Sequence, residues 1–224
     1  MLELWFDLEP EIIGEIGVNW NGSLELAHSM VESCKKAGCT AVKFQAFGPE
    51  HWKNYPQFPQ LKNCTITKDN IKVIDFICER NNIEWFCTPT YPKAVDMLEK
   101  YVYRYKIRYA DQNNYELQKK IFSKRKEVIA SSTSSRFYPD GVKTLYCIPK
   151  YPCKYEEIEF DKLGEFYGYS NHCKSKKAVI KAAKLGAKMI EVHVTMNYEY
   201  PFIDNPVSFD FEDLEDIIRK IKGL

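Results

Sequence analysis

The sequence predicts an α/β protein with the architecture of a (β/α)8 TIM barrel. Three observations predict this fold: β-type and helix-type segments alternate along all 224 residues, the β-type segments number eight, and polar side chains gather where those segments end. With 45% hydrophobic residues, the chain is long enough to bury about 70% of its unfolded surface around one core. We expect a single barrel domain over residues 1–224.

In the first half of the chain, turn and capping residues separate the expected elements. Ser23 is a suitable N-cap for a helix through Ala37, and Gly38 is suited to end it. Thr67 is expected to cap a helix that runs to about Asn81, and Pro89 begins a turn into the next helix. The expected elements are, in order, strand Ile12–Asn19, helix Ser23–Ala37, strand Thr40–Phe47, loop His51–Cys64, helix Thr67–Asn81, strand Ile83–Thr88, helix Lys93–Tyr101 and strand Tyr103–Tyr109.

The second half continues the alternation, with one gap. About a dozen residues between Ser132 and Thr144 are rich in serine and are broken by Pro139 and Gly141, a stretch that is too short for an ordinary crossover helix. Either a loop replaces the helix, which we expect, or the strand count is different at this place. The other expected elements are helix Tyr115–Ser123, strands Glu127–Ser132 and Thr144–Pro149, a weak helix near Glu156–Glu165, strand Phe166–Asn171, helix Ser175–Leu185, strand Met189–Thr195 and helix Phe211–Ile221.

Composition argues against two classes of partner. Lys and Arg number 32 against 31 Asp and Glu, and this balance does not indicate nucleic acid or membrane binding. Lys119–Lys126 is locally basic, and we interpret it as a solvated helix end. No run approaches the ~18–20 apolar residues of a membrane span.

Cysteine usage indicates a reducing compartment. The eight cysteines include no C-x-x-C pair, and acidic residues interrupt the hydrophobic start Met1–Glu11, so no signal peptide is expected. We therefore expect reduced, mostly buried thiols in a cytoplasmic protein. The glycosylation sequons at Asn21 and Asn63 are then chance matches.

Two histidines stand at the ends of the last two strands. In the final strand, Glu191 and His193 alternate with apolar residues, so the polar face is expected to point into the barrel. One βα unit brings His172 close to His193, and paired imidazoles are common ligands of divalent metals. The alternative is that both are hydrogen-bonded core histidines. Matching polar residues at the other strand ends favour the metal site.

The C-terminal strand ends of a barrel build its active site. Here they carry carboxylates, amides, lysines, hydroxyls and histidines, at Glu15, Asn19, Lys43, Gln45, Thr88, Lys106, Ser131, Tyr151, Ser170, His172, Glu191 and His193. Lysines and hydroxyls together suit a phosphate or carboxylate anion. Taken singly, each lysine also fits a salt-bridged surface residue. Lys43 is the stronger candidate, because apolar neighbours flank it and it shares the inward face of Gln45.

A set of motifs in fixed order resembles the N-acetylneuraminate (sialic acid) synthase family. The motifs are EIGVNWNGSLELA from Glu15, AVKFQ from Ala41, CTP from Cys87, YKI from Tyr105, DQNNYEL from Asp111, YP at Tyr151, GYSNH from Gly168 and LGAKMIEVHVT from Leu185. Together they cover nearly the whole chain. The resemblance implies an enzyme that condenses phosphoenolpyruvate with an N-acyl aldose, such as N-acetylmannosamine, to a nonulosonic acid and releases phosphate.

The resemblance also implies a role for each matching residue. His172 and His193 would hold Mn2+ or Mg2+. The phosphoenolpyruvate contacts would be Lys43, Thr88, Lys106, Ser131 and Ser170. Glu15, Gln45, Tyr151, Glu191 and Asp204 would line the acceptor side or lie directly behind it, and Asn19 would be a further substrate contact. The catalytic residues would be Glu15, Lys43, Gln45, Lys106 and Glu191.

The chain departs from the family pattern at several of these places. Tyr109 stands where a small residue would touch phosphate, next to Arg108, and Pro149 stands where the family commonly has asparagine. Further departures are Ala110, Asn171 in the Ser-Asp-His motif, Trp20 and Thr133.

The resemblance bears on partners as well. The family's C-terminal antifreeze-like domain, which reaches into a partner subunit's site, is not expected in a chain that ends at Leu224. The sequence leaves open whether a separate chain supplies that domain and whether the protein forms a homo-oligomer.

Two other functions stay open. One is a barrel of this family that binds a sugar or metal but does not turn over, which Tyr109 and Pro149 favour. The other is a different barrel aldolase or lyase, in which Lys43 or Lys106 would form a Schiff base.

Overall fold

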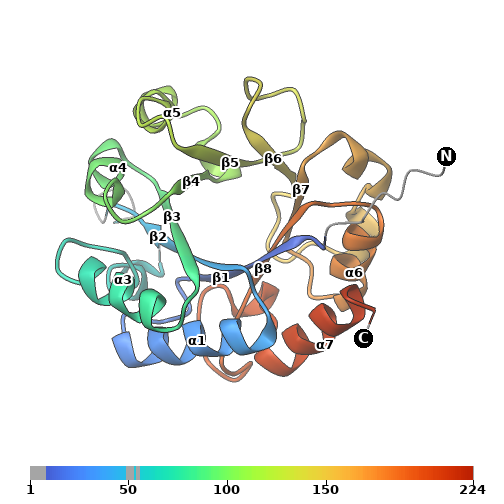
Figure 1. Cartoon of the computed structure of the whole chain (residues 1–224), viewed down its shortest axis with the longest axis horizontal. Coiled ribbons are helices and arrows are strands. Elements are labelled where there is room, and N and C mark those ends of the chain that lie inside the picture. Colours follow the sequence, from blue (N-terminus) through green and yellow to red (C-terminus); the bar gives the residue numbers. More distant parts are fainter. Residues whose placement is uncertain (1–8, 49–52, 54–55, 224) are drawn as a thin grey trace.

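Eight parallel strands close into a barrel, in which each strand pairs with its neighbours in sequence and β8 pairs back to β1 (Figure 1). The computed structural model describes residues 9–48, 53 and 56–223. The strands are β1 (Glu11–Gly17), β2 (Ala41–Ala46), β3 (Glu84–Pro89), β4 (Arg104–Ile107), β5 (Glu127–Ser132), β6 (Lys143–Tyr146), β7 (Gly168–Asn171) and β8 (Met189–His193). The predicted (β/α)8 barrel is confirmed.

Helices surround the barrel on the outside, and their apolar faces pack against the strands (Figure 1). They are α1 (Leu24–Ala37), α2 (Phe58–Leu61), α3 (Ile71–Arg80), α4 (Pro92–Leu98), α5 (Tyr115–Phe122), α6 (Lys176–Lys184) and α7 (Phe211–Ile221). Short 3-10 turns add η2 (Tyr109–Asp111), η3 (Tyr155–Glu157), η4 (Phe160–Glu165) and η5 (Asn205–Val207). As predicted, no helix joins β5 to β6.

The predicted ends of α1 are confirmed, and the predicted start of α3 is wrong. The Ser23 side chain accepts a hydrogen bond from the backbone N–H of Leu26, and Gly38 ends the helix at a φ of 97°. Thr67 instead forms a turn with Asn70, and α3 begins only at Ile71. Thr67 and Asn70 are both capping residue types, so the sequence does not decide between them.

Other boundaries differ by a few residues. The strands predicted to end at Asn19, Tyr109 and Pro149 end two or three residues earlier, because the chain turns into the site loops there. The weak helix expected near Glu156–Glu165 is two 3-10 turns. The short helix α2 lies inside the predicted loop His51–Cys64, of which residues 51, 52, 54 and 55 lie outside the described part.

At the N-terminal end of the barrel, the buried Arg104 is surrounded by three partly exposed carboxylates. The Arg104 guanidinium lies 2.7 Å from Glu11, 2.8 Å from Glu84 and 3.4 Å from Glu127. Burial opposes the charge on Arg104, but the three carboxylates outweigh burial and raise its pKa. These partners lie on β1, β3 and β5, so the ion pairs of Arg104 link β4 to three other strands of the barrel.

Strands β7 and β8 approach each other unusually closely at Gly168. A Cβ atom at this position would lie 2.0 Å from the carbonyl oxygen of Met189. Only glycine fits there without moving the backbone of β8. Two residues further along, the same pairing places Ser170 on β7 beside Glu191 on β8, and His172 follows directly after β7.

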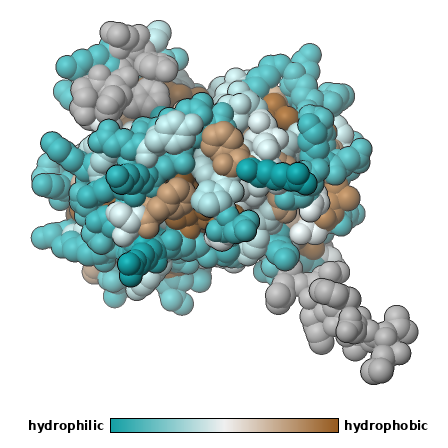
Figure 2. Space-filling model, turned by 90° about the horizontal axis from the view of Figure 1, so that it is seen from above, coloured by the Kyte–Doolittle hydropathy of each residue, from teal (hydrophilic) through white to brown (hydrophobic). Residues whose placement is uncertain are grey.

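The surface and the thiols agree with the composition. Figure 2 shows one face that is mostly hydrophilic, with small, separate apolar patches. All eight cysteines are buried and free of disulfides, as predicted. Within the described residues, every helix is too short or too polar to cross a membrane. The expectation about a signal peptide concerns Met1–Glu11, and residues 1–8 lie outside the described part.

Candidate active site

The C-terminal end of the barrel opens into a cavity of about 400 Å³. Each of the predicted site residues lines it except Asn19. Register explains why they meet: Glu15 on β1 lies beside Lys43 on β2 and beside His193 on β8, while Ser170 on β7 lies beside Glu191. A volume of this size is typical of a site for small molecules.

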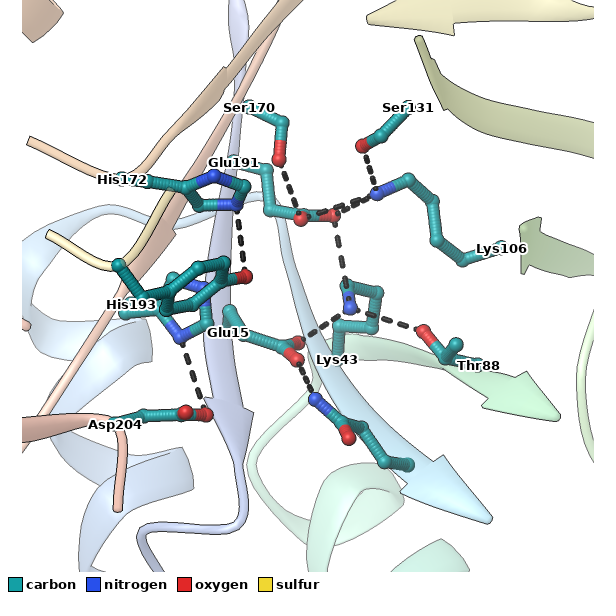
Figure 3. A network of polar contacts seen from close by, with 12 residues as sticks. Glu15, Lys43, Thr88, Lys106, Ser131, Ser170, His172, Glu191, His193 and Asp204 are labelled. Carbon is teal, nitrogen blue, oxygen red and sulfur yellow. Dashed lines mark hydrogen bonds and ion pairs between the residues drawn. The ribbon is translucent and has the colours of Figure 1, made fainter. Parts of the chain in front are cut away.

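Lys43 is held in the floor of the cavity by three side chains (Figure 3). Its Nζ lies 2.8 Å from Oε2 of Glu15 and donates a 3.0 Å hydrogen bond to Oγ1 of Thr88. A longer contact of 3.7 Å joins it to Glu191. Gln45 donates from Nε2 to the other oxygen of Glu15 at 2.8 Å, so both oxygens of that carboxylate are engaged.

Lys106 forms the second half of the floor (Figure 3). Its Nζ donates to Oγ of Ser131 at 2.8 Å and lies 3.1 Å from both oxygens of Glu191. Ser170 donates a 3.0 Å hydrogen bond to the same carboxylate. Glu191 therefore bridges the two lysines, and all of these side chains are almost fully buried.

The buried groups Glu15, Lys43, Lys106 and Glu191 shift one another's pKa values. Burial raises the pKa of Glu191, but Lys106 and Lys43 outweigh it and hold that pKa well below its usual value. Burial also raises the pKa of Glu15, which Lys43 only partly offsets, so that pKa stays above its ordinary value. Burial and the neighbouring Lys43 lower the pKa of Lys106. Glu191 is thus a firmly ionised group, and Glu15 is the carboxyl that more readily takes a proton.

The two histidines lie on the opposite wall, with their Nε2 atoms facing the same side chain. The Tyr151 hydroxyl lies 2.8 Å from Nε2 of His172 and 3.4 Å from Nε2 of His193. On the other side of its ring, His172 Nδ1 lies 2.7 Å from the carbonyl oxygen of Ile148, and His193 Nδ1 lies 3.4 Å from Oδ2 of Asp204. A carbonyl only accepts, so His172 carries its proton on Nδ1 and leaves a lone pair on Nε2.

The charge states of these groups differ. Burial and the neighbouring His193 lower the pKa of His172 to about 4, so its ring is neutral at pH 7. Burial opposes the charge on His193, but Asp204 outweighs it and raises the pKa of that ring. Tyr151 is 55% exposed, but its hydroxyl lies between the two histidines, where loss of water contacts raises its pKa, so the hydroxyl keeps its proton in the absence of a bound ion.

The donor set fits a divalent metal ion. Both Nε2 atoms face the cavity, and each Nδ1 has a carbonyl or carboxylate behind it, which is the arrangement that orients metal-binding histidines. Among the described residues, no group of three or more His, Cys, Asp or Glu side chains is placed to hold an ion. A metal here would therefore take two imidazoles and complete its coordination with other atoms.

Asn19 is the predicted site residue that the structure places elsewhere. Its Nδ2 donates to the carbonyl oxygen of Val194 at 2.8 Å and to Oγ of Ser208 at 2.9 Å. Asn19 is fully buried and does not line the cavity. It holds the loop after β8 in place, which is a structural role in place of the predicted substrate contact.

The family departures have structural explanations in two cases. Trp20 is buried and donates from its indole N–H to the carbonyl oxygen of Cys64. Asn171 is also buried, donates to the carbonyl oxygen of Cys173 and accepts from the Tyr169 hydroxyl. Both side chains fasten loops around the site and do not line the cavity.

Four of the other departures line the cavity, and Thr133 does not. Arg108, Tyr109, Ala110 and Pro149 form the wall after β4 and β6, on the side of Thr88 and Ser131. The Arg108 guanidinium pairs with Asp111 at the start of the following loop. A cation remains on this wall, although it already has a carboxylate partner.

Sequence reasoning missed an apolar part of the cavity wall. Val18, Leu61 and Ile203 line it, together with Gln57. The three apolar residues belong to a small cluster separate from the main core. They come from the turn after β1, the short helix α2 and the segment after β8, which share no hydrophobic period, so no sequence signal marked them.

Comparisons with known proteins identify the family of this chain. Residues 30–224 match the model of the NeuB family. The N,N'-diacetyllegionaminic acid synthase of Legionella pneumophila is 27% identical over 252 residues, covering 94% of this chain and 71% of that protein. The human N-acetylneuraminate-9-phosphate synthase is 24% identical over 251 residues, covering 94% and 69%.

A solved structure supports the same relationship. The N-acetylneuraminic acid (sialic acid) synthetase of Leptospira borgpetersenii serovar Hardjo-bovis, determined in complex with citrate, superimposes with a TM-score of 0.89 at 25% identity. The match covers 97% of this chain and 84% of that one. The predicted resemblance is confirmed: this chain belongs to the NeuB family, and its relatives are synthases of the sialic acid type.

Proposed function

We propose that this protein condenses phosphoenolpyruvate with an N-acyl aldose, such as N-acetylmannosamine or a related sugar, to a nonulosonic acid and inorganic phosphate. The observation that carries the proposal is the juxtaposition of the Lys43–Lys106 pair and the His172–His193 pair in one cavity. The first pair suits an anionic donor, and the second suits an ion beside the acceptor.

The donor is proposed to lie over the two lysines. Thr88, Ser131 and Ser170 place hydroxyl groups around them, and each hydroxyl already contacts a charged group of the floor. Lys43 and Lys106 are paired with Glu15 and Glu191, so an incoming phosphate or carboxylate would share cations that are already partly neutralised. Arg108 on the adjacent wall adds a third cation to this side.

The acceptor is proposed to lie near Glu15, Gln45 and Asp204. In the reaction, C3 of phosphoenolpyruvate attacks the aldehyde carbon of the open-chain sugar and C2 becomes an oxocarbenium centre. The aldehyde oxygen takes up a proton, and water adds to C2 and loses one proton. The resulting C2 hydroxyl loses its proton and becomes the C2=O ketone as the C2–O bond to phosphate breaks. When bound at the histidines, Mn2+ or Mg2+ supplies Lewis acidity at the aldehyde oxygen.

The carboxyl groups suit separate parts of this sequence. Glu191 stays ionised between the lysines and stabilises positive charge that develops at C2. Glu15 has the raised pKa, so its carboxylate is the better acceptor for the proton released from the attacking water. The two lysines stabilise the charge on the departing phosphate.

Particular residues of the cavity support two alternative functions. Tyr109 and Pro149 on the donor wall favour a barrel that binds a ligand without turnover. The lowered pKa of Lys106 favours a Schiff-base aldolase, although Lys106 is paired with Glu191. Borohydride added with a carbonyl substrate would trap a covalent adduct in an aldolase and none in a synthase.

The test is calorimetric binding of phosphoenolpyruvate to the metal-free protein, with and without Mn2+. Binding that Mn2+ strengthens, followed by phosphate release on addition of an N-acyl aldose, is the expected result. Binding without phosphate release from any N-acyl aldose would indicate the non-catalytic barrel. No binding in either state would contradict the proposed donor site.

A further inference from the structure

Tyr151 occupies an unusual position between the two histidines. Its hydroxyl oxygen lies 2.8 Å from Nε2 of His172 and 3.4 Å from Nε2 of His193. Its ring lies against the His172 ring at 4.1 Å between centroids and meets the His193 ring edge-on at 5.6 Å. One hydroxyl oxygen therefore lies within 3.4 Å of the Nε2 atoms of both histidines.

These spacings match those between neighbouring ligands of one metal ion. Ligands about 2.1 Å from an ion are about 3.0 Å apart at a right angle and about 3.4 Å apart at the tetrahedral angle. The observed 2.8 and 3.4 Å fall close to this range. An ordinary hydrogen bond explains the shorter contact, but it does not explain why both Nε2 atoms turn toward the same oxygen.

The surrounding chain holds all three atoms in place. The contact of His172 Nδ1 with Ile148 O fixes that ring, and the Asp204 carboxylate lies behind His193. The backbone N–H of Cys153, two residues after Tyr151, donates to the carbonyl oxygen of His172 at 2.9 Å. The tyrosine loop and the histidine strand therefore keep a fixed separation, as a metal site requires.

We infer that the Tyr151 hydroxyl oxygen is a third protein ligand of the metal ion, on the same face as His172 and His193. The inference rests on the metal site of the proposed function and adds a tyrosine to the pair of histidines. It also places the apolar ring of Tyr151 where it covers one side of the ion. The remaining positions then face the cavity and the acceptor.

The first measurement is Mn2+ affinity, from the electron paramagnetic resonance signal of the free ion. Tyr151→Phe keeps the ring and removes only the oxygen, and we expect it to weaken Mn2+ binding by about 10- to 100-fold. Tyr155→Phe is the matched control, since Tyr155 lies in the same segment but outside the cavity lining. It should bind Mn2+ as the unaltered protein does.

The second measurement can be made on the unaltered protein, so it does not require Tyr151→Phe to fold. Ferric iron added to the metal-free protein should form a bond to the Tyr151 oxygen, and the hydroxyl proton passes to the buffer. Iron(III) bound to a phenolate gives a visible charge-transfer absorption, which is expected in the unaltered protein and in Tyr155→Phe.

The outcomes separate this inference from the proposed function. Equal or tighter Mn2+ binding by folded Tyr151→Phe, or bound ferric iron without the visible absorption, would overturn the tyrosine ligand and leave the two-histidine site standing. Absence of any stoichiometric Mn2+ binding to the unaltered protein would overturn both. Phosphoenolpyruvate binding, measured separately, would still report on the donor site.

Discussion

Replacing Lys43 by methionine tests the donor site at its most connected residue. The change keeps the length of the side chain and removes the charge that lies 2.8 Å from Glu15. Breaking one partner of a buried ion pair costs about 3–5 kcal/mol, because the other charge is left buried without its partner. We expect Lys43→Met to lower the free energy of unfolding by that amount.

A second change separates stability from binding. Adding Glu15→Gln removes the orphaned charge, and the new amide oxygen can still accept the hydrogen bond from Gln45. The double variant should regain most of the lost stability, because a buried pair replaced as a whole costs little. Its affinity for phosphoenolpyruvate should still be about 10- to 100-fold weaker, which corresponds to one charge-assisted hydrogen bond.

The assays are urea unfolding for stability and titration calorimetry for phosphoenolpyruvate in the presence of Mn2+. The exposed Lys72 on α3 supplies the control, and Lys72→Met should change neither quantity appreciably. A folded Lys43→Met, Glu15→Gln double variant that binds phosphoenolpyruvate as tightly as the unaltered protein would refute the placement of the donor over Lys43.

Three further predictions concern the fold and its pH dependence. In chelating buffer, the free energy of unfolding should fall by up to about 3 kcal/mol as pH drops from about 6.5 to about 4. The cause is His172, whose pKa is lower in the folded protein, so the unfolded chain binds the proton first. His172→Gln should flatten this pH dependence, and an unchanged profile would contradict the lowered pKa of His172. Gly168→Ala should cost more than about 4 kcal/mol through the clash with Met189, whereas Gly164→Ala, which meets nothing within 4 Å, should be nearly neutral in the same urea assay. Arg104→Met should lower stability by about 1–2 kcal/mol, because Glu11 and Glu84 lose their closest cation while water still reaches these carboxylates and Glu127 keeps Lys143 at 2.5 Å; a loss below about 0.5 kcal/mol would show that the ion pairs of Arg104 do not stabilise the barrel.

Much of the fold was predictable because its signals are local. The alternation of β and α segments predicted the barrel, and Ser23 and Gly38 predicted the two ends of α1. The start of α3 was not predictable in the same way, since Thr67 and Asn70 are equally good caps and packing decides between them. The helix missing between β5 and β6 was visible from Pro139 and Gly141 alone.

The site was predictable where it lies on strands. Lys43, Lys106 and Glu191 follow the two-residue period of strands, so their inward direction follows from their apolar neighbours. Loop residues carry no such period. The apolar wall at Val18 and the position of the Tyr151 oxygen both depend on the paths of loops, which only the folded chain defines.

The most direct test of the proposed function is to measure phosphate release and sugar-acid formation in one sample that contains phosphoenolpyruvate, N-acetylmannosamine or a related N-acyl aldose, and Mn2+. We predict that phosphate appears only when an aldose is present and that mass spectrometry detects one molecule of the condensed acid for each phosphate. Phosphate release that does not depend on any aldose, or no release with any N-acyl aldose, would contradict a sugar-acid synthase.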